Sequence, residues 1–382
     1  MSSLATPGDR LTPTHRPAGL YLHVPFCRKK CLYCDFYSEV DLEPLSRFVD
    51  AVSREAQLYK GLFASYDSLY LGGGTPSLLD TKLLEKLLNP LFEMASLEDG
   101  AEITLEVNPA DITPVAAKKW GELGINRLSV GVQSFHDPTL EFLCRRHDSR
   151  QAREALDICL DAGFFHVSCD LLTGLPSRFP SEAPMKSLET ALETGVDHVS
   201  LYLLTVAPNT PLGALVNAGQ CRMPSPDRGA QTLLDAWDLL LRGGFQHYEV
   251  SNFAKGPQSI GRHNSKYWDH SPYLGLGPGA HSFDGTTRWW KEKAVHRYTQ
   301  RLLEGEAPPA RKETLTPDDL RLEKLMLGLR TSEGVPESLG FETARETVQR
   351  LLDQGYLVRE DHRLVPTSKG LLVADALARE LM

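Results

Sequence analysis

Short, continuously apolar strand patterns alternate with helical patterns through the first half of the chain. The predicted strands are 20–24, 67–71, 102–107, 126–132, 165–172 and 197–204. Helical patterns follow the first five strands, at about 44–59, 83–94 (interrupted by Pro90), 114–122, 149–162 and 182–193. Strands without polar alternation are typical of a parallel sheet that helices cover. Six such units in order predict an α/β fold with a partial (β/α)6 barrel, since a closed barrel needs eight.

The chain divides into four predicted segments. Residues 1–18 read as a flexible tail, and 19–205 as the partial barrel. Residues 206–310 form an α/β extension that includes a long loop-rich stretch at 254–290, and 311–382 form a small C-terminal unit. The order helix, helix, hairpin, helix in that unit resembles a winged-helix module. It lacks a dense basic helix, so we do not expect it to bind nucleic acid.

Composition limits the class of protein further. The 382 residues carry 41 basic and 50 acidic side chains, a net charge of −9. This charge argues against binding of nucleic acid through overall electrostatic attraction. No stretch approaches the ~18 apolar residues that span a bilayer, and residues 1–17 contain no apolar segment of the kind that signal peptides carry. These patterns predict a cytoplasmic protein.

Three of the seven cysteines lie within one eight-residue run. Cys27, Cys31 and Cys34 have the spacing C-x3-C-x2-C in YLHVPFCRKKCLYCDFYS. Three thiolates on one tight loop can hold three irons of a [4Fe–4S] cube and leave the fourth iron open for another ligand. The alternatives are a zinc site completed by a distant residue and three structural thiols. The other four, Cys144, Cys159, Cys169 and Cys221, are predicted not to be ligands.

Polar or glycine-rich residues follow each predicted strand. In parallel α/β folds the carboxyl ends of the strands lie at one edge of the sheet, and chemistry is concentrated there. The cysteine loop follows the first strand, so these residues would form one composite site with it. They include Gly73, Gly74 and Thr75 after the second strand, Glu106 after the third, Gln133 after the fourth and Asp170 after the fifth.

These motifs resemble the radical S-adenosylmethionine (SAM) superfamily and, within it, the coproporphyrinogen III oxidase-like and heme chaperone (HemW) branch. The resemblance covers about residues 20–380. It implies a [4Fe–4S] cluster whose open iron chelates SAM, and reductive cleavage of SAM to a 5′-deoxyadenosyl radical. It also implies a SAM site formed by Tyr21, Gly73, Gly74, Thr75, Glu106, Gln133, Arg145 and Asp170. Arg145 and Arg146 are adjacent, and the sequence leaves open which of them contacts SAM.

Two functions from different classes fit this branch. One is oxygen-independent oxidative decarboxylation of the propionates of coproporphyrinogen III, and the other is heme binding and delivery. The dehydrogenases typically carry a further cysteine two residues after the third, and Phe36 occupies that position here. This favours the heme chaperone and leaves enzymatic activity, and any catalytic residue, undetermined. A radical SAM protein acting on an unrelated substrate is the third alternative.

A second segment, RHNSKYWDH, resembles the H-N-x-x-Y-W motif of the heme chaperones. It supplies His263, Asn264, Tyr267 and Trp268 as candidate heme-binding residues. A neutral imidazole is a good axial ligand of iron, and aromatic rings can flank a porphyrin. From the residues alone, a histidine bonded to backbone with Trp268 as a core anchor is the competing interpretation. His281 is a lower-ranked candidate ligand, and His247 ranks lower still.

The resemblance also implies partners. They are heme, an apo-hemoprotein acceptor that the family resemblance places at a membrane, and a reductant for the cluster.

Overall fold

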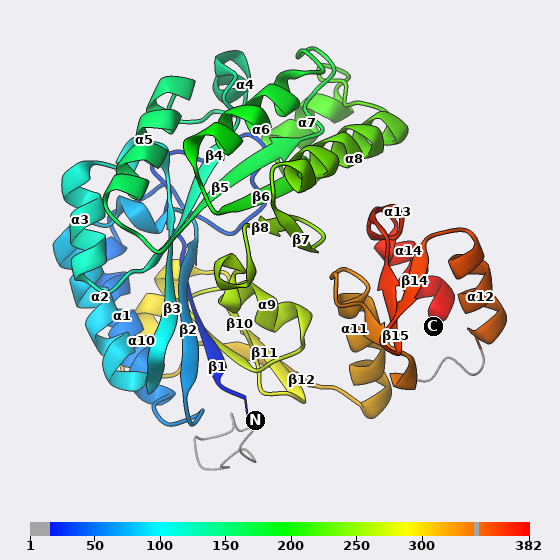
Figure 1. Ribbon diagram of the computed structural model, residues 1–382. Coiled ribbons are helices and arrows are strands. Elements are labelled where there is room, and N and C mark those ends of the chain that lie inside the picture. Colours follow the sequence, from blue (N-terminus) through cyan, green and yellow to red (C-terminus); the bar gives the residue numbers. More distant parts are fainter. Residues whose placement is uncertain (1–15, 340–343) are drawn as a thin grey trace.

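The computed structural model describes residues 16–339 and 344–382, and a curved twelve-stranded sheet forms its centre (Figure 1). Six neighbouring strands run parallel in chain order: β1 (Ala18–Val24), β2 (Tyr66–Gly73), β3 (Leu97–Val107), β4 (Arg127–Gln133), β5 (His166–Thr173) and β6 (His198–Leu203). Each overlaps a predicted strand, so the α/β class and the partial barrel are confirmed. Residues 1–15 of the predicted tail lie outside the described residues.

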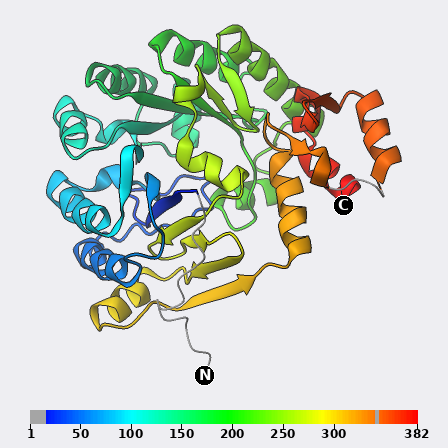
Figure 2. The ribbon, with the colours of Figure 1, turned by 60° about the horizontal axis from the view of Figure 1, so that its bottom comes forward.

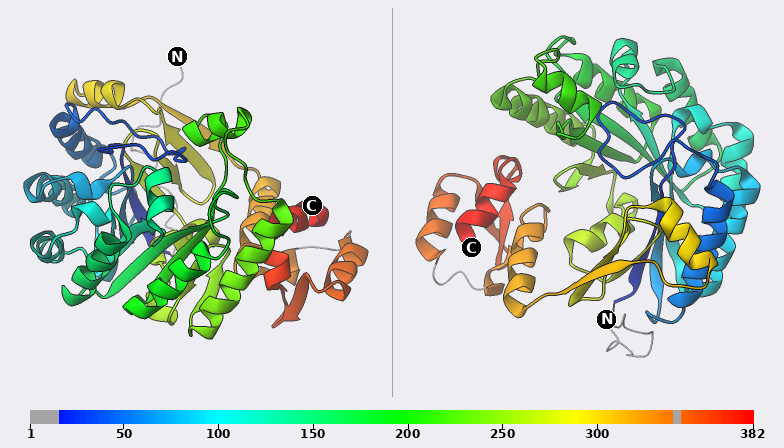
Figure 3. Two further views of the ribbon diagram at one scale, coloured as in Figure 1. Left: turned by 90° about the horizontal axis from the view of Figure 1, so that it is seen from above. Right: turned by 180° about the vertical axis from the view of Figure 1, so that it is seen from behind.

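Helices cover the outer, convex face of this sheet, as Figure 3 shows. Leu20, Leu22 and Val24 of β1 are fully buried on that side, since alternate residues of a strand share a face. Pro90 lies inside a continuous helix flanked by buried leucines, so the predicted interruption is wrong. The helices are α1 (Leu45–Leu58), α2 (Thr81–Met94), α3 (Pro114–Glu122), α4 (Asp137–Phe142), α5 (Ser149–Asp161) and α6 (Ala183–Thr194).

The predicted extension adds strands to both edges of the barrel sheet. Beyond β6 lie β8 (Asn252–Ala254) and β7 (Gln246–Glu249), both antiparallel to their neighbours. Beyond β1 lie β9 (Tyr273–Leu276), which is parallel to β1, and then β10 (His281–Phe283), β11 (Thr287–Lys291) and β12 (Ala310–Thr314). The helices of this region are α7 (Pro211–Asn217), α8 (Pro226–Arg242), α9 (Arg262–Trp268) and α10 (Val295–Leu303).

The stretch 254–290 is therefore more ordered than the sequence predicts. It contains α9 and three strands as well as its glycine turns, so the prediction of a long loop-rich segment is wrong. α9 lies inside the curve of the sheet, against β1 and β2 (Figure 2). This short helix is positioned by tertiary contacts that no local pattern reveals.

One buried ion pair joins the extension to the first helix. Lys291 Nζ on β11 lies 2.8 Å from Glu55 Oε1 on α1, and the two side chains are 1% and 0% exposed. The Tyr298 hydroxyl donates a hydrogen bond to Glu55 Oε2 at 2.6 Å, and the Gly277 N–H donates to the same oxygen at 2.8 Å. The carboxylate thus has an ion pair on one oxygen and two hydrogen bonds on the other, which offset the cost of burying its charge.

The C-terminal unit has its own hydrophobic core and a three-stranded antiparallel sheet. Its elements are α11 (Pro317–Gly328), β13 (Val335–Pro336), α12 (Arg345–Asp353), β14 (Leu357–Glu360), β15 (Arg363–Pro366), α13 (Ser368–Leu371) and α14 (Ala374–Leu381). The predicted hairpin is β14 and β15. The predicted helix 342–354 corresponds to α12, and residues 342 and 343 lie outside the described residues. The Val250 N–H donates to the Arg330 carbonyl at 2.8 Å and connects this unit to the barrel.

Candidate functional site

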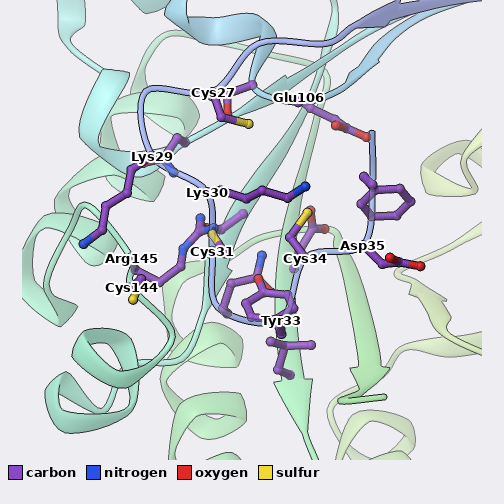
Figure 4. A pocket seen from close by; sticks show the side chains of 18 of the residues that line it. Cys27, Lys29, Lys30, Cys31, Tyr33, Cys34, Asp35, Glu106, Cys144 and Arg145 are labelled. Atoms are coloured by element: carbon purple, nitrogen blue, oxygen red, sulfur yellow. Dashed lines mark hydrogen bonds between the residues drawn. The ribbon is translucent and has the colours of Figure 1, made fainter. Parts of the chain in front are cut away.

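A cavity of about 550 Å³ opens at the carboxyl edge of the parallel strands. Cys27, Cys31 and Cys34 line it from one loop that follows β1, as Figure 4 shows. The loop is fixed at its base, because the Cys27 N–H donates to the Glu39 carbonyl at 2.9 Å and the Thr75 N–H donates to the Phe26 carbonyl at 2.8 Å. All of the predicted SAM-site residues except Tyr21 line this cavity.

The cavity presents three thiols from one loop, and a [4Fe–4S] cubane takes one thiolate for each of three irons when its fourth iron is left open. Among the described residues, no three His, Cys, Asp or Glu side chains surround a single ion position. Burial raises the pKa of Cys34, and Cys31 and Cys27 are close enough to raise it further. The raised pKa keeps the free thiol of Cys34 protonated, so binding of a cluster at this loop would release that proton.

Of the other cysteines, only Cys144 lines the cavity (Figure 4). Cys159, Cys169 and Cys221 are buried. Burial raises the pKa of Cys159 to about 12, which keeps that thiol protonated and inert.

The glycine run after β2 brings its backbone against the cysteine loop. Gly73 has φ +107°, and a Cβ there would lie 2.4 Å from the His23 ring. A Cβ on Gly74 would lie 2.5 Å from the Phe26 carbonyl oxygen. Only glycine fits at either position. Gly73, Gly74 and Thr75 all line the cavity, and the Thr75 hydroxyl donates to Cys27 Sγ at 3.4 Å.

Glu106, at the end of β3, is held in the cavity wall by two donors. The Tyr70 hydroxyl donates to Oε1 at 2.8 Å, and the Gly73 N–H donates to Oε2 at 3.1 Å. Burial raises the pKa of Glu106 to about 7, and the nearby Asp170 carboxylate acts in the same direction. Burial likewise raises the pKa of Asp170, which accepts a hydrogen bond from Ser129 at 2.7 Å.

The structure separates the two adjacent arginines. Arg145 Nη1 donates to Cys31 Sγ at 3.1 Å and Nη2 donates to the Gly131 carbonyl. Arg146 forms a two-pronged pair with Asp111, at 2.7 and 3.2 Å. Arg145 is therefore the one whose charge faces the cysteine loop. Gln133 lines the cavity with φ +73°, an uncommon conformation for a side chain other than glycine.

Tyr21 does not line this cavity. Its hydroxyl and His23 Nδ1 are 3.0 Å apart, and its ring stacks on Tyr70 with centroids 6.1 Å apart. Tyr21 therefore contacts the site through its neighbours on the inner face of the barrel.

His263 is enclosed in the barrel interior, on α9. It is 1% exposed, and its ring stacks on those of Tyr70 and Tyr21, with centroids 5.2 and 6.2 Å away. Its Nδ1 lies 3.1 Å from the Ser68 hydroxyl and its Nε2 lies 2.9 Å from the Tyr267 hydroxyl. Burial lowers the pKa of His263 to about 3, so the imidazole is neutral. Asn264 and Trp268 are both half-buried on the same helix.

Three side chains that the sequence does not single out contact His263: Ser68, Tyr70 and Glu102. Glu102 on β3 accepts the backbone N–H groups of Arg262 and His263, each at 2.9 Å, and so fixes the start of α9. Ser68 and Tyr70 stand two residues apart on the inner face of β2. In the sequence, their spacing indicates only that the two side chains share one face of the strand. It does not show whether that face points into the barrel or away from it.

Two family models match this chain, one over the barrel and one over the C-terminal unit. The family model of the radical SAM superfamily matches residues 21–185, and that of the HemN C-terminal domain matches residues 315–373. The heme chaperone HemW of Mycobacterium tuberculosis is 36% identical over 375 residues, which are 96% of this chain and 95% of that protein. HemW of Synechocystis is 35% identical over 84% of this chain and 79% of its own.

Among solved structures, the Escherichia coli coproporphyrinogen III oxidase HemN, described as a radical SAM enzyme, superposes with a TM-score of 0.82. It is 23% identical and covers 98% of this chain and 92% of its own, and at that identity the likeness shows the fold alone. The chain belongs to the radical SAM superfamily and, within it, to the HemW family. Membership implies a [4Fe–4S] cluster and SAM as cofactors. No helix among the described residues combines the length and apolar character needed to cross a membrane.

Proposed function

We propose that this protein is a heme chaperone, which binds heme and delivers it to apo-hemoproteins. The observation that carries the proposal is the similarity, over almost the whole chain, to relatives named heme chaperones. Phe36 supports it, because this side chain stands at the cavity, 71% exposed, where the dehydrogenases typically carry a further thiol. Oxidative decarboxylation of coproporphyrinogen III is therefore the less favoured function.

We further propose that Cys27, Cys31 and Cys34 hold the cluster. When bound, the cluster and SAM supply one-electron chemistry. The proposed SAM site combines the glycine backbone, which can approach closely, with the charged side chains of Glu106, Arg145 and Asp170. Gln133 and Thr75 add polar groups to the same cavity, and Tyr21 supports the site through its stack on Tyr70. The chain's part is to orient SAM and to exclude water.

The ionisation of Glu106 should control SAM affinity. We expect the amino group of SAM to donate to the Glu106 carboxylate, and the ionised carboxylate is the stronger acceptor. Since burial raises the pKa of Glu106 to about 7, affinity should fall as the pH drops below that value, by up to ~10-fold for each unit. Equilibrium dialysis across this range measures it. In Glu106→Gln, binding should be weak and nearly independent of pH; a wild-type profile in that variant would contradict the assignment.

We propose His263 as the axial ligand of the heme iron, with Tyr267, Trp268 and Asn264 as its surroundings. A neutral imidazole offers iron one nitrogen lone pair. In the structure both ring nitrogens are engaged, by Ser68 and by Tyr267, so one of these hydrogen bonds must open before iron can bind. Heme loading therefore includes a local rearrangement of the side chains around His263.

An anaerobic heme titration of cluster-reconstituted protein, followed by absorbance, tests the function. We expect saturable binding near one heme per chain. His263→Ala should weaken binding at least ~10-fold, which is about 1.4 kcal/mol, or change the spectrum of the bound heme. The matched control is His296→Ala, since His296 is exposed on α10. His281→Ala tests the lower-ranked ligand.

Binding that does not saturate, in the wild type as in the variants, would contradict the heme chaperone. Normal binding in His263→Ala would contradict only the assignment of the ligand. We also propose a cytoplasmic site of action, a separate reductant for the cluster, and a membrane-bound hemoprotein as one acceptor.

A further inference from the structure

The proposed SAM cavity and the heme motif share one side chain, Tyr70 on β2. Its hydroxyl donates to Glu106 in the cavity wall at 2.8 Å. Its ring stacks on the His263 imidazole with the centroids 5.2 Å apart and the planes 27° apart. Among the described side chains, Tyr70 alone both forms a hydrogen bond with Glu106 and stacks on His263. The two sites therefore lie back to back and meet at this tyrosine.

The stack on Tyr70 belongs to the arrangement in which His263 is closed to iron. The imidazole is held there by Ser68, by Tyr267 and by the rings of Tyr70 and Tyr21. Iron ligation removes at least one of these hydrogen bonds and moves the ring. Any ligand that stabilises the position of Tyr70 thus favours the closed arrangement, and heme favours the open one.

We propose that Tyr70 couples the two sites, so that SAM bound at Glu106 weakens the binding of heme at His263. The inference rests on the proposed function and deepens it. A cationic ligand beside Glu106 keeps the carboxylate charged, and a charged acceptor strengthens the hydrogen bond from the Tyr70 hydroxyl. The strengthened bond holds the Tyr70 ring, and the ring holds the imidazole. By linkage, heme weakens SAM binding by the same factor.

This coupling would order the two ligands in time. The chain takes up heme most readily before SAM is bound, and SAM binding then promotes release of the heme. Tyr70 is a positioning residue in this scheme, since it acts through Glu106 and His263 rather than on the iron.

Heme titrations with and without saturating SAM test the coupling. The full chain is used with its cluster reconstituted and kept oxidised, so that SAM stays intact. In the wild type we expect SAM to raise the heme Kd by about 5-fold or more. Tyr70→Phe keeps the ring and loses the bond to Glu106, so its heme Kd should no longer respond to SAM. Equilibrium dialysis should show that heme raises the SAM Kd of the wild type by the same factor and leaves that of Tyr70→Phe unchanged.

Tyr66→Phe is the matched control. Tyr66 lies on the same strand, is 1% exposed, and has a hydroxyl that makes no hydrogen bond to any residue the structure describes. Its removal should leave the SAM effect at the wild-type size.

Each alternative outcome has a distinct meaning. Saturable heme binding that ignores SAM in the wild type would overturn the coupling and leave the heme chaperone in place. A SAM effect that persists in Tyr70→Phe would overturn the role of Tyr70. Absence of saturable heme binding to all three proteins would overturn both the coupling and the proposed function.

Discussion

Replacing Cys27, Cys31 or Cys34 by alanine should abolish incorporation of the [4Fe–4S] cluster. In the proposed site each thiolate would bind a different iron, so no other residue of the triplet could replace the lost bond. Iron and sulfide content after anaerobic reconstitution, together with the visible absorbance of the cluster, measures the result.

Cys144→Ala is the matched control, because Cys144 lines the same cavity but stands outside the loop. It should retain the full cluster. An intact cluster in any of the three triplet variants would remove that residue from the ligand set, and loss of the cluster in Cys144→Ala, with the fold intact, would add a ligand.

Lys291→Met should lower the free energy of unfolding by about 3–5 kcal/mol. The substitution removes the cation and leaves the Glu55 carboxylate fully buried without its counter-charge. Urea unfolding followed by circular dichroism measures the loss. The double variant Glu55→Gln/Lys291→Met removes the charge as well and should recover much of it.

The comparison is Lys86→Ala, which breaks an ion pair with Asp50 in which the side chains are 51% and 45% exposed. Water screens such a pair, so the expected change is about 1 kcal/mol or less. Equal losses of unfolding free energy in Lys291→Met and Lys86→Ala would show that the buried pair stabilises the fold no more than an exposed one.

The sequence predicts the barrel well, because its evidence is local. Each strand is a short apolar run followed by a polar strand end, and the parallel arrangement brings those ends together. The cavity residues Gly73, Glu106 and Asp170 could therefore be named before the fold was known.

What the sequence leaves open depends on contacts between distant segments. Adjacent arginines look alike in a sequence, and they differ in the structure because Asp111 binds Arg146. The stretch around α9 has too few residues for a clear helical period, and its helix is held by Glu102, which lies 160 positions earlier. Tyr70 stands between two leucines of β2, and only the folded sheet shows that its face of the strand points inward, toward Glu106 and His263.

The attachment of α9 to Glu102 limits how the heme motif can move. Both oxygens of this carboxylate accept N–H groups at the first turn of the helix, and Arg127 lies 3.6 Å from one of them. The second turn is held as well, because Lys266 pairs with Asp67 on β2 at 2.8 Å and donates to the Pro17 carbonyl at 2.8 Å. α9 is therefore clamped to the barrel at both turns, and a heme iron that binds His263 would have to draw the imidazole out by rotation of its side chain or release the second clamp.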